Sequence, residues 1–140
     1  MVEKKLKGKV IVVSGGTKGV GRAASEEFAR QGARVVIGGR DEASAMKSIH
    51  LMKTYGSEGL FVYTDLLNIK NCETLFDRTI EAYGRVDGFF SYAGVTPVSP
   101  LDSCDEETFD WVMDVNFKAA FFAASRPSGI CGATVAAPLS

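Results

Sequence analysis

Three spaced glycines are the residues of this chain whose types and spacing most clearly predict chemistry. They lie in the turn Ser14-Gly15-Gly16-Thr17-Lys18-Gly19-Val20-Gly21, between an apolar run and a helical pattern. Gly15 can adopt the positive φ of a tight turn, Gly19 lets a ligand approach the backbone, and Gly21 lets helix and strand pack closely. The helix that follows presents unpaired N–H groups and the positive end of its dipole. The turn therefore predicts a cradle for a phosphate group.

A glycine-rich turn can also be a flexible loop, so its spacing matters. The turn is not a P-loop, because no Lys-Ser or Lys-Thr pair follows Gly21. The spacing Gly15-x-x-x-Gly19-x-Gly21 also differs from the G-x-G-x-x-G of the long-chain dinucleotide folds. The turn instead resembles the T-G-x-x-x-G-x-G of the short-chain dehydrogenase/reductase family, with Ser14 in place of the family's Thr.

Further segments extend this resemblance from about residue 7 to residue 124. Asp65-Leu66 follows an apolar run and is similar to the family's adenine-contacting Asp after the third strand. Ala93-Gly94 matches the end of the family's N-N-A-G turn, whereas Ser91-Tyr92 replaces its two Asn residues. The resemblance therefore implies that two amides, which brace the central strand and the cofactor ribose in the family, are missing here.

A polar side chain, Asn116, stands within an apolar stripe of the last predicted helix. The stripe has i, i+3, i+4 spacing and consists of Phe109, Val112, Met113, Phe117, Ala120, Phe121 and Ala124. We expect Asn116 to be buried and its amide to be bonded to backbone or water, because an unsatisfied buried amide costs roughly 1–3 kcal/mol. A core Asn that merely bends its helix is the alternative. The resemblance implies a catalytic Asn, which in the family holds a water that relays protons towards a catalytic Lys.

The residues after the second predicted strand bear on the choice of nucleotide. An NAD site needs a carboxylate there for the ribose 2′-OH. This strand ends in Gly39-Arg40, and Gly39 occupies the position at which NAD-preferring relatives carry Asp. Arg40 and Lys18 can instead pair with a 2′-phosphate, Arg through its planar fork and Lys as a point charge. The two cations favour NADP(H) over NAD, although Asp41 opposes a phosphate and an ordinary solvated turn is the alternative.

A regular alternation of elements positions these segments. Periodicity predicts strands at 9–14, 34–38, 60–64 and 86–91 and helices at 20–31, 42–55, 69–83 and 106–124. This alternation is typical of a parallel sheet with right-handed crossovers and helices on both faces. The predicted fold class is therefore α/β, a Rossmann-like doubly wound sheet that is incomplete. The resemblance to this class implies the order 3-2-1-4 for the four strands. Residues 1–125 then form a partial NADP(H)-binding domain, and the fourth strand is an exposed apolar edge that favours association.

Composition limits the other possibilities. With 140 residues, a net charge of −1 and 46% hydrophobic residues, the chain fits one soluble globular unit with no electrostatic case for nucleic acid or an anionic membrane. No apolar run approaches the roughly 20 residues of a membrane span, and the start of the chain lacks the apolar region of a signal peptide. Three Cys residues without metal-ligand spacing and a single His, His50, predict a reduced, cytoplasmic setting and no metal site.

The groups that complete catalysis in the resembled family are not found here. Carbonyl reduction by a nicotinamide hydride needs an acid for the developing alkoxide and a group that holds the carbonyl. In the family these are Tyr and Ser, with a Lys four residues after the Tyr. No Tyr of this chain has such a Lys, since the corresponding positions hold Gly59, Leu67, Asp87 and Thr96. The late serines follow no predicted fifth strand; they are Ser125, Ser128 and Ser140.

Residues 126–140 show neither helical nor strand periodicity and are predicted to be an irregular tail. Reading their possible codons one base later allows Ala-Ile-Arg-Tyr-Met-Arg-Arg-Asn-Gly-Gly-Gly-Ala-Ile-Val, which resembles the family's helix end, glycine turn and fifth strand. We therefore predict a change of reading frame near Ser125, with a natural splice variant or an artificial chain end as alternatives.

Together these patterns predict the NADP(H)-binding portion of a short-chain oxidoreductase that interconverts a small-molecule carbonyl and an alcohol, 3-oxoacyl reductase-like or acting on another ketone. The predicted cofactor-binding residues are Ser14, Gly15, Thr17, Lys18, Gly19, Val20, Gly21, Arg40, Asp65, Leu66, Ala93 and Gly94. Asn116 is the catalytic candidate, and without the Ser, Tyr and Lys we expect no turnover. A non-catalytic nucleotide-binding or interaction module, or an inactive decayed product, is the alternative. The resemblance also implies that intact relatives often form homo-oligomers.

Overall fold

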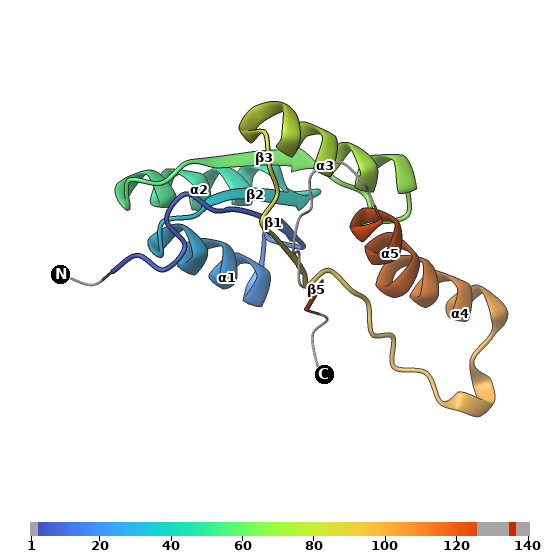
Figure 1. The fold of residues 1–140 in the computed structure, drawn as a ribbon. Helices are drawn as coiled ribbons and strands as arrows, with labels where there is room; N and C mark the ends of the chain where they lie inside the picture. Colours follow the sequence, from blue (N-terminus) through green and yellow to red (C-terminus); the bar gives the residue numbers. More distant parts are fainter. Residues whose placement is uncertain (1–2, 126–134, 137–140) are drawn as a thin grey trace.

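A parallel sheet in the order β3-β2-β1-β4-β5 forms the centre of the computed structural model, which describes residues 3–125 and 135–136 (Figure 1). Its strands are β1 (Val10–Ser14), β2 (Arg34–Gly39), β3 (Gly59–Tyr63), β4 (Gly88–Ser91) and β5 (Val135–Ala136). Val12 of β1 pairs with Val36 on one side and with Phe89 on the other, so β1 is a central strand. The predicted doubly wound α/β class is confirmed, together with the order of its first four strands.

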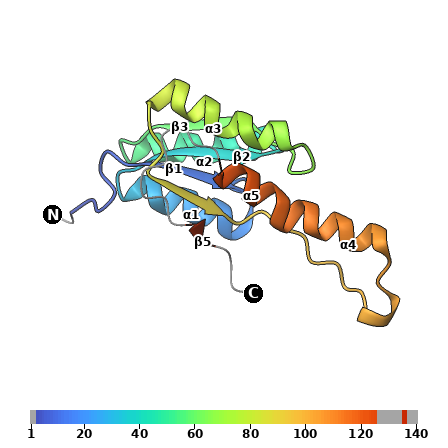
Figure 2. The ribbon, with the colours of Figure 1, turned by 45° about the vertical axis from the view of Figure 1, so that its right-hand side comes forward.

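Helices cover both faces of this sheet, as the alternation of elements predicted (Figures 1 and 2). The helices that carry these two layers are α1 (Gly19–Arg30), α2 (Glu42–Thr54), α3 (Ile69–Tyr83) and α5 (Ala119–Ala124). Ile37 of the sheet packs in one buried cluster with residues of α1 and α2, and Val36 packs in a second with residues of α3 and α5. The strands are apolar on both faces because both faces are covered.

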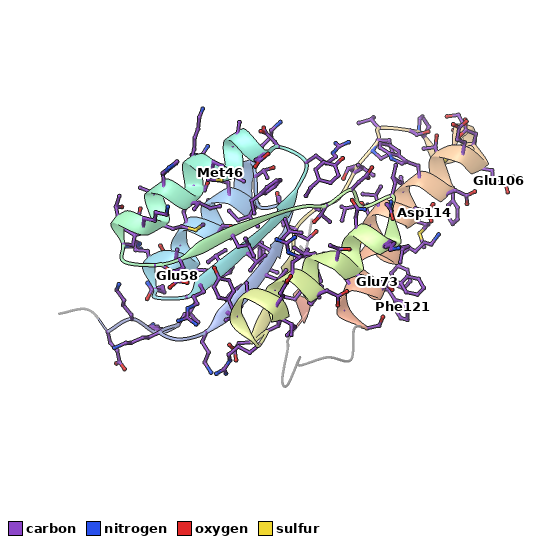
Figure 3. All side chains as sticks on the ribbon, turned by 90° about the horizontal axis from the view of Figure 1, so that it is seen from above. Met46, Glu58, Glu73, Glu106, Asp114 and Phe121 are labelled. Atoms are coloured by element: carbon purple, nitrogen blue, oxygen red, sulfur yellow. The ribbon has the colours of Figure 1, made fainter. Side chains whose placement is uncertain are left out.

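The predicted helix 106–124 forms, but it is not a uniform α-helix. It consists of α4 (Glu106–Met113), the π-helical segment η2 (Asp114–Lys118) and α5. A short 3₁₀ turn, η1 (Leu101–Ser103), precedes it. α5 packs against α3, whereas α4 extends beyond the sheet, with Glu106 at its far end (Figures 2 and 3).

The apolar stripe predicted for this helix is wrong in part. Phe109, Phe117 and Phe121 are 56%, 61% and 56% exposed, and Asn116 is exposed as well, whereas Val115 is buried. The π-helical segment explains the difference from residue 114 onward, whereas Phe109 precedes that segment and lies in α4, which extends beyond the sheet. A π turn contains more residues than an α turn, so it rotates the residues beyond it relative to the α-helical periodicity from which the stripe was derived. Ala119 and Ala123, rather than the phenylalanines, therefore enter the buried cluster beneath α3.

A fifth strand forms where the sequence pattern predicted only an irregular tail. β5 pairs in parallel with β4, with Val135 opposite Phe89 and Ala136 opposite Phe90. The predicted irregular tail is therefore wrong at these two residues, and β4 is not an exposed edge along its whole length. The pairing rests on backbone hydrogen bonds, for which a two-residue segment needs no alternation of side chains. The predicted change of reading frame falls on residues from 126 onward that, this pair apart, lie outside the described residues.

Candidate functional site

A cleft of about 280 Å³ opens where the carboxyl ends of β1, β2, β3 and β4 approach α4. In open α/β sheets, ligands bind outside the carboxyl ends of the strands, at the point where the strand order reverses. In this sheet the reversal falls between β1 and β4, because β2 and β3 lie on one side of β1 and β4 on the other. The cleft therefore has the position of a ligand site in this class of fold.

The glycine turn has the geometry predicted for a close phosphate approach. Gly15 and Gly19 have φ values of +78° and +55°. A Cβ on Gly15 would lie 2.7 Å from the amide nitrogen of Ala93, and one on Gly21 would lie 2.0 Å from the carbonyl oxygen of Gly15. Nothing lies within 4 Å of a Cβ built on Gly19, so the backbone there is open on that side. The turn thus packs tightly against β4 and α1 while one part of its backbone stays accessible.

The N-terminus of α1 differs from those of α2, α3 and α4, because it lacks a side-chain cap. Asp41, Asn68 and Asp105 accept backbone N–H hydrogen bonds at the starts of the other three helices. Lys18 precedes α1 with extended dihedrals and no cap bond, and the first turn of α1 holds no acidic residue. The first N–H groups of α1, which have no partner within the helix, are therefore available to an anion.

Three charged side chains surround the end of β2. Arg40 lines the cleft and is exposed, and among the described residues its guanidinium has no hydrogen-bond or ion-pair partner. Lys18 Nζ lies 3.8 Å from Asp41 Oδ2, with 77% of the Lys18 side chain exposed. An exposed ion pair of this kind contributes little to stability, so the Lys18 ammonium can pair with another anion at little cost.

Asp41 is engaged by its own helix rather than directed to the cleft. Its Oδ1 accepts from the Ser44 N–H at 3.1 Å and its Oδ2 accepts from the Ser44 hydroxyl at 2.7 Å. These two hydrogen bonds, assisted by Lys18 and Lys47, hold the pKa of Asp41 below its usual value. The carboxylate that opposed an NADP assignment in the sequence is thus an N-cap of α2.

The turn after β3 places Asp65 and Leu66 in the cleft wall. Asp65 Oδ1 accepts from the Leu67 N–H at 3.0 Å, and the Asp65 N–H donates to Asn71 Oδ1 at 3.2 Å. The other carboxylate oxygen has no hydrogen-bond partner within the part of the chain that the structure describes. Asp65 therefore keeps an acceptor available at the wall of the cleft.

The junction between β1 and β4 is held by backbone bonds where the family's two Asn amides are missing. The N–H groups of Tyr92 and Ala93 both donate to the Ser14 carbonyl at 3.0 Å. Ser91 is buried, and its hydroxyl has no hydrogen-bond partner among residues 3–125. The turn that carries Ala93 and Gly94 into the cleft wall is therefore fixed on β1 without those amides.

Asn116 fastens the segment after β4 to the π-helical segment. Its Oδ1 accepts from the Val95 N–H at 2.7 Å, and its Nδ2 donates to the Val95 carbonyl at 2.8 Å. Its Oδ1 would also lie 3.1 Å from a Cβ on Gly94, so a side chain at position 94 would press against this contact. The expectation that the amide is bonded to backbone is confirmed, although the side chain is exposed and does not line the cleft.

The structure brings most of the predicted cofactor residues to one cleft. The predicted residues in its wall are Ser14, Gly15, Thr17, Arg40, Asp65, Leu66, Ala93 and Gly94. Lys18, Gly19, Val20 and Gly21 belong to the start of α1 beside this wall but do not line it.

Other wall residues were not predicted as site residues. They are Gly38, Gly39, Thr64, Leu67, Val95, Trp111 and Val115. Gly39, Thr64, Leu67 and Val95 directly adjoin the predicted positions Arg40, Asp65, Leu66 and Gly94, a signal that was available in the sequence. Trp111 and Val115 carried no such signal, because α4 reaches the cleft only through the tertiary fold.

The described residues contain no cluster of three or more His, Cys, Asp or Glu side chains arranged to hold a metal ion. Within the same residues, no helix combines the length and apolar character that a membrane crossing requires.

Comparison with known proteins identifies the family to which this chain belongs. The family model for short chain dehydrogenase matches residues 9–127. The chain belongs to the short-chain dehydrogenase family. An uncharacterized oxidoreductase of Thermotoga maritima is 34% identical over 114 residues, which cover 81% of this chain and 45% of the relative. An L-rhamnose 1-dehydrogenase (NAD(P)(+)) of Azotobacter vinelandii is 35% identical over 118 residues, covering 81% and 46%.

Solved structures show the same fold. A crystal structure of the NADH-dependent reductase A1-R′ complexed with NAD has a TM-score of 0.80 and 29% identity, covering 86% of this chain and 51% of that one. A short chain dehydrogenase from Burkholderia cenocepacia in complex with NADP has a TM-score of 0.80 and 27% identity, covering 86% and 49%. The chain spans about half the length of the relatives it matches.

Proposed function

We propose that the cleft binds NADP(H), and that this chain is the nucleotide-binding portion of a short-chain oxidoreductase that interconverts a carbonyl and an alcohol. The observation that carries the proposal is the N-terminus of α1 behind the glycine turn, near Arg40: among the described residues, no side chain caps this helix and none pairs with the Arg40 guanidinium. The two features supply donors for a diphosphate and for a second anionic group. That the similar structures hold NAD or NADP supports the nucleotide class.

The roles of the residues follow from their places in the cleft. The N–H groups at Gly19 and Val20 would meet the diphosphate, and Arg40 with Lys18 would pair with a 2′-phosphate on the adenosine ribose. The free acceptor of Asp65 would accept a hydrogen bond from the amino group of the base. The bound nucleotide supplies or accepts a hydride, and this chain orients it. Asn116, by holding Val95, would fix the wall of the site beside the reacting end.

Nucleotide titration tests this assignment. We expect isothermal calorimetry on the full chain to show that NADPH binds at least about tenfold more tightly than NADH, as one charge-assisted phosphate contact supplies about 1.5–3 kcal/mol. Arg40→Asp should narrow or invert that preference. Lys5→Asp makes the same change of charge in the exposed segment before β1 and should leave it intact. Equal affinity of the unmutated chain for both nucleotides would contradict the NADP assignment.

A non-catalytic nucleotide-binding module is the second candidate, favoured by the lack of a Tyr with a Lys four residues on. A general acid contributes about 10²–10⁴-fold to the rate, so we expect this chain to reduce no ketone of a test panel detectably with NADPH. Restoring the reading frame near Ser125 and continuing translation should yield an apolar strand ending in Ser, then Tyr-x-x-x-Lys, and activity with them. If no frame of the downstream nucleotides encodes those residues, the binding module becomes the better proposal.

A further inference from the structure

Trp111 differs from the other exposed aromatic residues of the α4–η2–α5 helix because it lines the cleft. Phe117 stacks on Phe121 with ring centroids 6.0 Å apart, and Phe121 meets Phe122 edge-on at 5.4 Å. Trp111 is 40% exposed and has no ring partner among the described residues. Its indole is thus an aromatic surface at the wall of a ligand cleft without an aromatic neighbour of its own.

The surroundings of Trp111 in the cleft are apolar and come from two separate elements. Val115 follows four residues later along the same helix and is buried, so both side chains share one helix face. Leu66 and Leu67 reach the same cleft from the turn after β3, and Leu67 is 58% exposed. A cleft with apolar side chains from two elements and an acceptor at Asp65 suits a flat ring that bears an amino group.

The position of this apolar part relative to the phosphate cradle selects one half of a dinucleotide. The cradle lies at β1 and α1, Arg40 lies at the end of β2, and Leu66-Leu67 follows β3 at the far side of the sheet. A ribose with its 2′ position at Arg40 therefore directs its base toward Leu66, away from β4.

We propose that Trp111 stacks on the adenine ring of the bound nucleotide and, with Leu66 and Leu67, forms the base subsite of this cleft. This inference rests on the proposed function. Stacking between a base and an aromatic side chain is tolerant of sequence and geometry because every base has a π face, and it is strongest with a large ring. Trp111 is accordingly a binding residue of α4, the helix that carries no other aromatic side chain in the cleft wall.

Adenosine 2′,5′-bisphosphate is the probe that isolates this subsite, because it lacks the nicotinamide half. Trp111→Ala should weaken its binding to the full chain by about 5- to 100-fold, the range that loss of one stacked aromatic ring produces. Trp111→Phe should retain most of the affinity. Phe109→Ala is the matched control, since Phe109 lies on the same helix, is 56% exposed and does not line the cleft.

Fluorescence gives a second readout, because Trp111 is the single Trp of the chain. The bisphosphate should change its emission in proportion to occupancy, and ribose 5-phosphate, which lacks a base, should not. If the probe binds by calorimetry but Trp111→Ala keeps the original affinity and the emission does not respond, the stacking role is overturned while the proposed function stands. If neither the bisphosphate nor NADPH binds the unmutated chain by calorimetry, the proposed function fails and the base subsite with it.

Discussion

Helices α3 and α4 differ sharply in how their apolar sides are used. Both begin with a side-chain cap, Asn68 in α3 and Asp105 in α4. In α3, Leu75 and Phe76 are fully or almost fully buried against the sheet, whereas α4 contains no buried residue. An amphipathic pattern therefore specifies that a helix forms and where it begins, but not what covers its apolar side. What covers the apolar side of a helix depends on its contacts with the rest of the fold. α3 makes such contacts through buried side chains such as Leu75 and Phe76, whereas α4 has no buried side chain.

The largest expected effect comes from removing a buried aromatic ring of α3, that of Phe76. Phe76 is 2% exposed, and its ring meets that of Phe89 edge-on at 5.1 Å. Phe76→Ala should lower the free energy of unfolding by about 3–5 kcal/mol in urea titration followed by circular dichroism. Phe121 lies on the outer side of α5 (Figure 3) and is 56% exposed, so Phe121→Ala should change it by less than about 0.5 kcal/mol. Equal losses for the two variants would mean that the outer rings are buried in solution.

The second prediction concerns the glycine turn, where packing and ligand binding depend on one position. Gly21→Ala places a Cβ 2.0 Å from the Gly15 carbonyl oxygen, so the turn must move, and we expect nucleotide binding to be lost in calorimetry. Overpacking of this kind also lowers stability by about 1–3 kcal/mol. Gly56→Ala is the control for backbone strain without a clash, because Gly56, unlike Gly21, has a positive φ, +76°, and nothing lies within 4 Å of its Cβ. The Gly56→Ala variant should lose stability through backbone strain and keep its affinity for the nucleotide. Unchanged nucleotide affinity of Gly21→Ala would contradict the proposal that the glycine turn is the phosphate cradle.

The same contrast separates what the sequence could predict from what it could not. The class of fold and the glycine turn follow from local patterns, because apolar periodicity and the lack of a Cβ at Gly15 and Gly21 act on neighbouring backbone. The strand order is not encoded locally and was predicted from the order typical of the Rossmann-like class. The exposure of Asn116 did not follow, since the π-helical segment changes which residues of the helix face inward. Trp111 in the cleft depends on where α4 crosses the strand ends, which no spacing within the helix encodes. β5 depends on pairing with β4, which is distant in the sequence.

The third prediction concerns the outer aromatic stripe of the long helix. We define this stripe as Phe117, Phe121 and Phe122, whose rings contact one another in sequence and which are 61%, 56% and 40% exposed. Contiguous exposed apolar side chains favour association, so we expect the chain to elute from size-exclusion chromatography as a concentration-dependent oligomer. Phe117→Ser with Phe121→Ser should shift the elution volume toward a monomer without a loss of cooperative unfolding. β5 pairs with Phe89 and Phe90 of β4, so we expect the aromatic stripe to contribute more to association than the edge of β4 does. A monodisperse monomer of the unmutated chain would contradict this prediction.

The smallest expected effect concerns the N-terminal cap of α4. Asp105 Oδ1 accepts from the Thr108 N–H at 2.8 Å, and hydrogen bonds from Thr108 hold the pKa of Asp105 below its ordinary value. A carboxyl group whose pKa is lower in the folded than in the unfolded state stabilises the fold above its unfolded pKa of about 3.9, and this contribution is lost as pH falls through the lower folded value. Amide hydrogen exchange at Thr108 should therefore be slow near pH 6, and the local protection should fall below about pH 4.

Asp105→Ala should remove this protection at every pH, because it leaves the first N–H groups of α4 without their cap. Asp102 is a suitable control, since it lies in η1, outside α4, and Asp102→Ala should leave the exchange at Thr108 and its pH dependence unchanged. Because α4 has no buried residue to hold it, the cap should matter more here than the equivalent bond of Asn68 does in α3, where Leu75 and Phe76 anchor the helix. Equal loss of protection from exchange at the start of α3 in Asn68→Ala and at the start of α4 in Asp105→Ala would mean that burial does not compensate for a lost cap. The two helices would then differ in how their apolar side chains are covered, but not in how strongly each depends on its cap.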